Sequence, residues 1–125
     1  MTVTGDLTAY GAERCGIDTG TTAVIVLRLT DDKQLANTPA TSPPGVESFQ
    51  HVDALVLKRD GSVAWIGDGS SIVGHGRRIV EVRKLDKRGL FVLDSGSGVR
   101  MDSLRLHRST LRWRDGSQTR TATLH

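Results

Sequence analysis

Two short aspartate triplets come closest to a catalytic pattern in this chain. Asp18-Thr19-Gly20 and Asp94-Ser95-Gly96 each place a carboxylate in a glycine-containing turn. Two carboxylates held at close range share one proton, because both cannot ionise together, and such a pair can act as acid and base in hydrolysis. The triplets therefore predict one alternative function, a small hydrolase that uses Asp18 or Asp94.

The triplets resemble those of aspartic proteases, in which two Asp-Thr/Ser-Gly turns occupy equivalent places in related halves. The internal repeat described below has an offset of 55 and aligns Asp18 with Val73 and Asp94 with Pro39, so the triplets are not equivalent. A homodimer that uses Asp18 alone stays open. LDSGSG also resembles the nucleophile loop of trypsin-like serine proteases, but the chain is short for that fold and no histidine has the matching context.

A basic strand pattern near the C-terminus gives a second candidate site. Within 104–114, apolar residues alternate with basic ones, and a period of two sends the two sets to opposite faces of a sheet. We expect Arg120 on the next strand to join the basic face. The predicted binding residues for an anionic partner are Arg105, His107, Arg112, Arg114 and Arg120. Nucleic acid, an acidic polysaccharide or an acidic protein would suit such a face.

The charge distribution supports this placement. The net charge is +3, but residues 1–76 carry five Lys/Arg against nine Asp/Glu, whereas residues 77–125 carry twelve against five. The C-terminal part, with a net charge of +7, is therefore the part expected to meet an anion.

Other chemistry-bearing patterns are weak. Segment 67–78, GDGSSIVGHGRR, lacks the GK[ST] of a phosphate-binding loop, and no aspartate-rich stretch follows the EF-hand pattern. Cys15 is the single cysteine, which gives neither a disulfide nor a metal-binding spacing, and we expect a half-buried thiol at a strand end. The sequence therefore predicts no catalytic residue, no metal and no cofactor.

The elements that must carry these residues are strands. The apolar runs are short, rich in β-branched residues and bounded by Gly, Asp, Ser and Pro, and helical periodicity is nearly absent. Asp60-Gly61 and Asp115-Gly116 predict tight hairpin turns, because both residue types tolerate a positive φ. The predicted strands are 7–10, 23–29, 53–58, 62–66, 79–85, 90–93, 103–107, 110–114 and 119–124.

Two long connections separate these strands. Segment 36–51 holds all three prolines and cannot form a central strand, because proline lacks the N–H that a ladder needs. Segment 67–78 is rich in glycine and serine and is expected to be the second loop.

An internal repeat is the most informative pattern. ALVLKRDGSVAWIGDG (54–69) aligns with SLRLHRSTLRWRDG (103–116), so that Trp65 matches Trp113 at an offset of 48. At an offset of 55, Tyr10 matches Trp65, and 24–35 aligns with 79–90, which places Arg28 on Arg83. A period near 50 residues with about four strands is typical of propeller blades. The aromatic residues are expected to pack between stacked sheets.

Four segments carry a resemblance to a family. ERCGIDTGTTAVIVLRL, LVLKRDGSVAWI, VEVRKLD and LDSGSGVRMDSLRLHRSTLRWRDG resemble the C-terminal blades of uncharacterised actinobacterial proteins with β-propeller-like repeats, over residues 7–124. The resemblance implies an all-β, antiparallel fold of two to three propeller-like blades in tandem, and it supplies no catalytic residue. Such proteins are often exported, although the segment MTVTGDLTAY has neither the basic nor the apolar region of a signal peptide.

The expected organisation is a single all-β repeat module over 1–125, with units near 1–50, 51–100 and 101–125. Fewer than four blades do not close a ring. The chain is therefore expected to be part of a larger protein, an oligomer that completes the ring, or an open sandwich. The leading functional hypothesis is a non-catalytic scaffold or binding module that self-associates or packs against other blades. The alternatives are the hydrolase and a polyanion-binding module, and no apolar run is long enough to span a membrane.

Overall fold

A computed structural model describes residues 2–15, 20–41, 48–71 and 78–125, and these residues form an all-β fold of antiparallel strands. No helix occurs among them. The strands are β1 (Thr2–Thr4), β2 (Leu7–Cys15), β3 (Gly20–Arg28), β4 (Lys33–Pro39), β5 (Ser48–Leu57), β6 (Val63–Ser71), β7 (Arg78–Asp86), β8 (Gly89–Ser95), β9 (Arg105–His107), β10 (Thr110–Asp115) and β11 (Gln118–Thr123).

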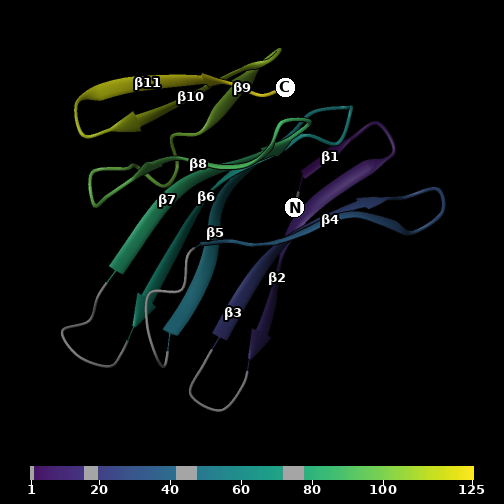
Figure 1. Ribbon diagram of the computed structural model, residues 1–125, viewed down its shortest axis with the longest axis horizontal. Coiled ribbons are helices and arrows are strands. Elements are labelled where there is room, and N and C mark those ends of the chain that lie inside the picture. Colours follow the sequence, from purple (N-terminus) through teal and green to yellow (C-terminus); the bar gives the residue numbers. More distant parts are fainter. Residues whose placement is uncertain (1, 16–19, 42–47, 72–77) are drawn as a thin grey trace.

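The strands form three sheets, each made from consecutive strands (Figure 1). Sheet A has the order β1-β2-β3-β4, sheet B has the order β5-β6-β7-β8, and sheet C has the order β11-β10-β9. Every neighbouring pair is antiparallel. Short connections favour this up-and-down arrangement, because a hairpin joins adjacent antiparallel strands directly.

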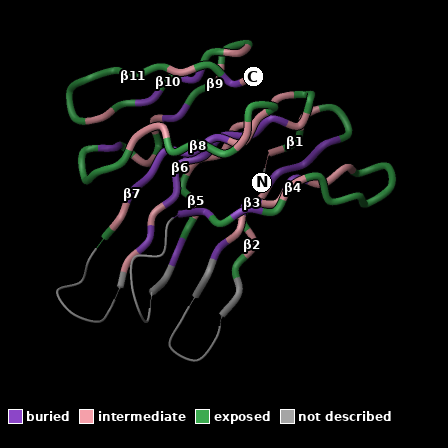
Figure 2. The backbone as a smooth tube through the Cα atoms, viewed as in Figure 1, coloured by how far each residue is buried: buried purple, intermediate pink, exposed green. Residues whose placement is uncertain are grey.

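Sheet B is the middle layer, and its two inner strands, β6 and β7, are covered on both faces. Four successive residues of β6, 63–66, are fully buried, which a sheet with one solvated face would not allow. Strand β10, in the outer sheet C, instead alternates between buried and exposed residues along its length. Within sheet B the edge strand β8 is largely exposed, whereas long stretches of β6 and β7 are buried (Figure 2).

Two apolar cores join the three layers. The core between sheets A and B contains Leu7, Ala9, Val24, Val26, Leu57, Val63 and Trp65. The core between sheets B and C contains Ala64, Ile66, Val80, Val82, Val99, Leu104, Leu111, Trp113 and Leu124. Since alternate residues of β6 enter different cores, this strand connects the whole stack.

The predicted strands are confirmed, and the two predicted loops are shorter than expected. Strands β1 and β4 were not predicted, and the residues expected to form a loop over 36–51 include the end of β4 and the start of β5. Pro39 is tolerated because it is the last residue of β4, an edge strand of sheet A. Likewise β6 continues to Ser71, into the segment expected to be a loop.

The turn chemistry follows the sequence. Gly61 and Gly116 have φ values of 96° and 60°, in the left-handed region that favours glycine. The carboxylate Oδ1 of Asp60 accepts a hydrogen bond from the Ser62 backbone N–H at 2.9 Å, which closes the turn between β5 and β6. The Gly116 turn sets the register of the β10–β11 hairpin of sheet C.

Both tryptophans are buried, as predicted. Trp65 lies in β6 with 0% exposure, and Trp113 lies in β10 with 2%. The proposed alignment at a shared offset of 55 does not fit strand β7, however. The alignment matches Tyr10 with Trp65, so their partners on the next strand should match as well. Tyr10 pairs with Ile25, and Trp65 pairs with Arg83. Arg83 therefore corresponds to Ile25 and not to Arg28.

The three sheets do not form a closed propeller. They stack in order along the chain, and among the described residues no further sheet packs on the outer face of sheet A or of sheet C (Figure 1). The outer face of sheet C is the one that carries the predicted basic residues.

Candidate functional site

The basic residues lie on sheet C because two hairpins place them there. Strand β10 pairs with both neighbours, so that Arg112 lies opposite Arg105 on β9 and opposite Thr121 on β11. Residues directly opposite each other in an antiparallel pair share a face. Leu111 and Trp113 point into the core with sheet B. The residues that alternate with them on β10 therefore point outward.

Four of the five predicted residues share this outer face. Arg105, Arg112 and Arg114 are exposed and lie on the face of sheet C that points away from the core. His107, which pairs with Thr110, is exposed on the same face. The placement of these four side chains agrees with the period-two pattern of the sequence.

The placement predicted for Arg120 is wrong. Arg120 pairs with Trp113, and so its side chain lies on the inner face of sheet C. The two-residue turn after Asp115 is the cause: it pairs Asp115 with Gln118, so even-numbered residues of β10 lie opposite odd-numbered residues of β11. Counting alternate positions straight through the turn therefore assigns β11 to the wrong face.

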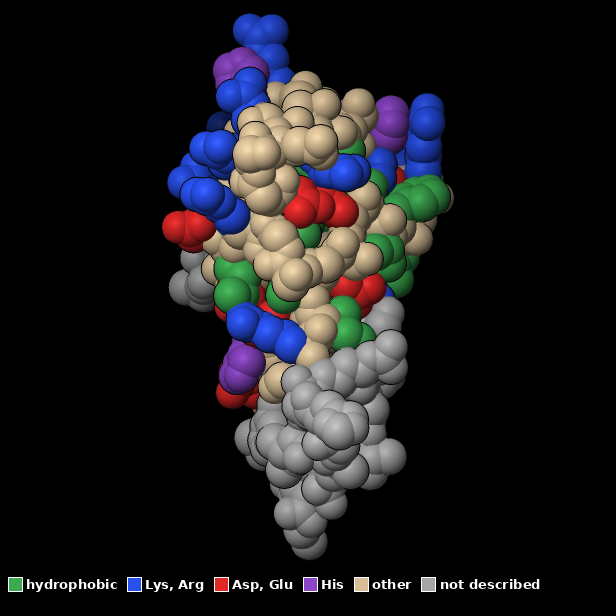
Figure 3. Space-filling model, turned by 90° about the vertical axis from the view of Figure 1, so that its left-hand side faces the viewer, with side chains coloured by type: hydrophobic (Ala, Val, Ile, Leu, Met, Phe, Trp, Pro, Cys, Tyr) green, Lys and Arg blue, Asp and Glu red, His purple; other side chains and the backbone are tan. Residues whose placement is uncertain are grey.

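The outer face carries positive charge that no described carboxylate pairs with. Among the described residues, Arg105, Arg112, Arg114 and His107 form no ion pair. The Nη1 of Arg105 donates hydrogen bonds to the backbone oxygens of Leu104 at 2.9 Å and Asp102 at 3.0 Å, which orients the guanidinium. Figure 3 shows Lys and Arg side chains gathered at the upper end of the molecule, the end at which sheet C lies in Figure 1.

A groove runs along this face. Arg105, His107, Thr110 and Arg112 line a volume of about 510 Å³. Its walls come from the β9–β10 hairpin, so one turn positions three cationic or protonatable side chains around one space. A groove of this kind can hold an anionic group by charge-assisted hydrogen bonds.

A row of threonines beside the arginines was not predicted from the sequence. Thr119, Thr121 and Thr123 are exposed on β11, and their pairing with Arg114, Arg112 and Thr110 places them on the same outer face. The signal in the sequence was the alternation TRTAT, but it is informative only once the register is known. The face thus offers hydroxyls as well as guanidinium groups.

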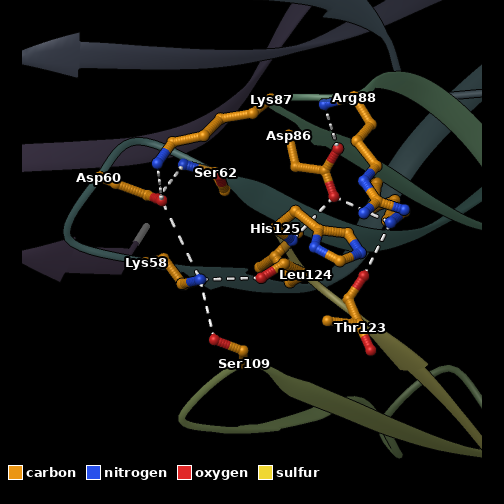
Figure 4. Close-up of polar contacts among 11 residues, drawn as sticks. Lys58, Asp60, Ser62, Asp86, Lys87, Arg88, Ser109, Thr123, Leu124 and His125 are labelled. Carbon is orange, nitrogen blue, oxygen red and sulfur yellow. Dashed lines mark hydrogen bonds and ion pairs between the residues drawn. The ribbon is translucent and has the colours of Figure 1, made fainter.

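Two lysines, the half-buried Lys58 and the buried Lys84, attach the C-terminal end of sheet C to sheet B (Figure 4). Lys58 Nζ donates hydrogen bonds to the Leu124 oxygen at 2.8 Å and to Ser109 Oγ at 3.0 Å. Lys84 Nζ donates to the Thr123 oxygen at 2.7 Å. These bonds tie both ends of the β10–β11 hairpin region to the middle layer, so the outer face is held by a rigid support.

Asp86 completes this attachment. Its Oδ2 accepts hydrogen bonds from Lys84 Nζ at 2.8 Å and from the His125 backbone N–H at 2.9 Å (Figure 4). Its Oδ1 accepts one from the Arg88 N–H at 2.9 Å. Burial raises the pKa of Asp86, but these hydrogen bonds and the Lys84 charge outweigh burial and hold the pKa at about 2.

Asp94, the candidate catalytic carboxylate, lies on the opposite side of sheet C from the groove. Its Oδ2 accepts a hydrogen bond from Trp113 Nε1 at 2.9 Å and lies 3.6 Å from Arg120 Nε. The carboxyl of Asp115 is next to it: a hydrogen bond with Asp94 is the main cause of a raised Asp115 pKa, followed by burial and the Asp94 charge. Asp18, the other candidate, lies outside the described residues.

A second cavity of about 450 Å³ lies between sheets A and B. Its lining includes Glu13 of β2 and His51 of β5, whose Oε1 and Nδ1 atoms are 3.4 Å apart. Asp53 also lines it at a bulge of β5, and burial, followed by the charge of Asp68, raises the Asp53 pKa. None of the predicted binding residues lies in this cavity.

The remaining predictions concern metals and membranes. Within the described ranges, no three His, Cys, Asp or Glu side chains are grouped in a way that would hold a metal ion. The side chain of Cys15 lies outside the described structure. No helix in the part of the chain that the structure describes is long and apolar enough to cross a membrane.

Comparisons of this chain with protein-family models, with curated proteins and with solved structures find no match.

Proposed function

We propose that this chain is a non-catalytic β-repeat module that acts as a binding unit, and that the outer face of sheet C holds an anionic partner. The observation that carries the proposal is the groove of Arg105, His107, Thr110 and Arg112 on an exposed sheet face where no described carboxylate pairs with the arginines.

Equivalent tryptophan contacts support the repeat part of the proposal. Trp65 Nε1 donates to the oxygen of Ala40, which follows the fourth strand of sheet A, at 2.8 Å. Trp113 Nε1 donates to Asp94 in the fourth strand of sheet B at 2.9 Å. Each indole therefore reaches the same region of the preceding sheet, and each is paired with an arginine on the next strand.

The charge of the outer face supports the binding part. Arginine is always protonated and binds carboxylate, sulfate or phosphate groups with two parallel hydrogen bonds. A single-sign surface also draws an oppositely charged partner toward it by long-range attraction. Since the face is exposed and supported by sheet B, a ligand can bind without unfolding any part of the core.

The hydrolase alternative has weaker support. Asp94 accepts a hydrogen bond from Trp113 and pairs with Arg120, and these contacts hold it in a packed layer rather than in the groove. Its close neighbour is Asp115, which the triplet pattern did not single out. We therefore assign Asp94 a structural role in this proposal.

The test is the salt dependence of polyanion binding. Each phosphate or sulfate contact releases a counterion, so about three arginine contacts give a slope of log K against log salt of roughly −2 to −3. Arg112→Ser is expected to reduce the steepness by about one unit. Arg120→Ser is the matched control, because it removes the same charge from the same sheet but from the inner face.

If both variants change the slope equally, the outer face has no special role. If Arg112→Ser leaves both the affinity and the slope unchanged, the proposed site is wrong. Thermal unfolding of the two variants provides the folding control, and Arg112→Ser is expected to unfold at nearly the wild-type temperature because its side chain is exposed.

A further inference from the structure

The outer face of sheet C combines two kinds of polar group in an ordered way. Its rows run across the strands: Arg105 and Arg112 lie in line with Thr121, and Arg114 lies beside Thr119. The arginines therefore lie on β9 and β10, and the threonines lie on the neighbouring strand β11, with Thr110 at one end of β10. Successive outward residues on one strand are about 6.8 Å apart, and adjacent strands are about 4.8 Å apart.

This order favours a ligand whose repeating unit carries both an acidic group and hydroxyls. Arginine supplies fixed, paired donors for the acidic group. A threonine hydroxyl both donates and accepts, which suits an alcohol that does the same. The described face holds both sets along the strand direction, so a linear ligand can engage them at several units in succession.

The face lacks the groups that stack on or read the bases of nucleic acids. Single strands bind by stacking their bases on aromatic side chains, and the aromatic residue of sheet C, Trp113, is buried in the core with sheet B. Base pairs in a duplex are read by an element that enters a groove, whereas this face is the side of a three-stranded sheet. Arginine–phosphate contacts alone would bind a duplex but would leave the threonine row without a partner.

We infer that the anionic partner is an acidic polysaccharide, a chain of sugars that bears carboxylate or sulfate groups. The inference rests on the proposed function. The polysaccharide lies along β10, with its acidic groups over Arg105, Arg112 and Arg114 and its hydroxyls over the threonines of β11. The groove lined by His107 and Thr110 accommodates one acidic substituent.

The experiment removes hydroxyls without removing charge. The variant Thr119→Val/Thr121→Val keeps the β-branched shape that suits a strand and deletes two hydroxyl groups. Binding is measured by calorimetry to a sulfated oligosaccharide (a heparin fragment) and to a carboxylated one (oligogalacturonate). A DNA duplex, single-stranded DNA and neutral dextran of similar length are the comparison ligands.

We expect the wild-type chain to bind at least one acidic oligosaccharide more tightly than either DNA at the same salt concentration. The double valine variant is expected to bind it about 5- to 30-fold more weakly, from the loss of two neutral hydrogen bonds, with an unchanged salt slope. Thr121→Ser, which keeps the hydroxyl, is expected to bind within about twofold of wild type. Thr4→Val in sheet A is the control for a threonine elsewhere.

Three outcomes would overturn the inference. The first is a double valine variant that binds the oligosaccharides as tightly as wild type does. The second is tighter binding of DNA than of either acidic oligosaccharide, in which case the proposed anion-binding function survives and only the partner is wrong. The third is absence of salt-dependent binding to every polyanion, which contradicts the proposed function as well. Should the double variant fail to fold, the single variants Thr119→Val and Thr121→Val decide the same question.

Discussion

The indole Nε1 of Trp113 donates a hydrogen bond to the Asp94 carboxylate, across the interface between sheets C and B, at 2.9 Å. The carboxylate also lies 3.6 Å from Arg120 Nε. A residue that the sequence suggested as catalytic thus holds two layers together, and an arginine that it suggested as a ligand contact supports that attachment.

Removing either indole is expected to destabilise the stack. Trp65→Ala and Trp113→Ala each delete a buried side chain that joins two layers, which costs about 3–5 kcal/mol of unfolding free energy. Urea unfolding measures the loss. Phe91→Ala is the control, because Phe91 is 42% exposed on β8, and its replacement is expected to cost far less. Equal losses for Phe91 and Trp113 would contradict the assigned packing.

Replacing Asp94 is expected to affect stability and not catalysis. Asp94→Asn removes the charge that faces Arg120 and weakens the hydrogen bond from Trp113, at a cost of about 1–3 kcal/mol. Peptide-library cleavage assays are expected to show no activity that depends on Asp94 or Asp18. Cleavage by the wild-type chain that disappears in Asp94→Asn or Asp18→Asn would instead support the hydrolase alternative.

Asp86 is expected to make the attachment of sheet C sensitive to acid. Its pKa is about 2 in the folded chain and 3.8 ordinarily, so its ionised form stabilises the fold. The stabilisation, about 2 kcal/mol, is fully present above the ordinary pKa and is lost as the pH falls through about 2. Asp86→Asn should therefore be less stable than wild type at neutral pH, and the difference should shrink below about pH 4. A constant difference from pH 2 to 7 would contradict this assignment.

Asp115 is expected to give stability the opposite dependence on pH. Its folded pKa is raised, chiefly by the hydrogen bond with Asp94, so its contribution to stability is present at low pH and is lost as the pH rises through the folded pKa. Asp115→Asn should remove this loss while keeping a hydrogen-bonding side chain. Chemical unfolding of Asp115→Asn and wild type between pH 3 and 7 compares the two slopes of stability against pH.

Self-association is the remaining expectation, and we propose that it involves the open outer face of sheet A in a second copy of the chain. Ile25 lies on that face, since its neighbours Val24 and Val26 point into the core, and Val3 is 56% exposed on the edge strand β1. Exposed edges and apolar sheet faces favour pairing between chains. Sedimentation at tens of micromolar is expected to show oligomers that Ile25→Lys dissociates, and a monomeric wild-type chain would contradict the proposal.

The sequence by itself predicted nine of the eleven described strands, and it predicted which residues of a given strand share a face. Val63 to Ile66 and the alternation around Trp113 carry that information locally, because side-chain direction in a strand alternates strictly. Asp60-Gly61 and Asp115-Gly116 predicted the positions of two hairpin turns, because few residues other than glycine adopt a positive φ without strain.

Only the tertiary structure decided how strands on either side of a turn relate to each other. Arg120 lies on the inner face, and not on the predicted outer face, because the two-residue turn pairs it with Trp113. Arg28 does not correspond to Arg83, because the register of β3 against β2 differs from that of β7 against β6. A shift of one residue in register exchanges the two faces of a strand, and the sequence pattern of one strand does not contain that shift. The threonine row of β11 and the carboxyl pair of Asp94 and Asp115 became visible for the same reason, since each depends on residues that pairing and stacking bring together.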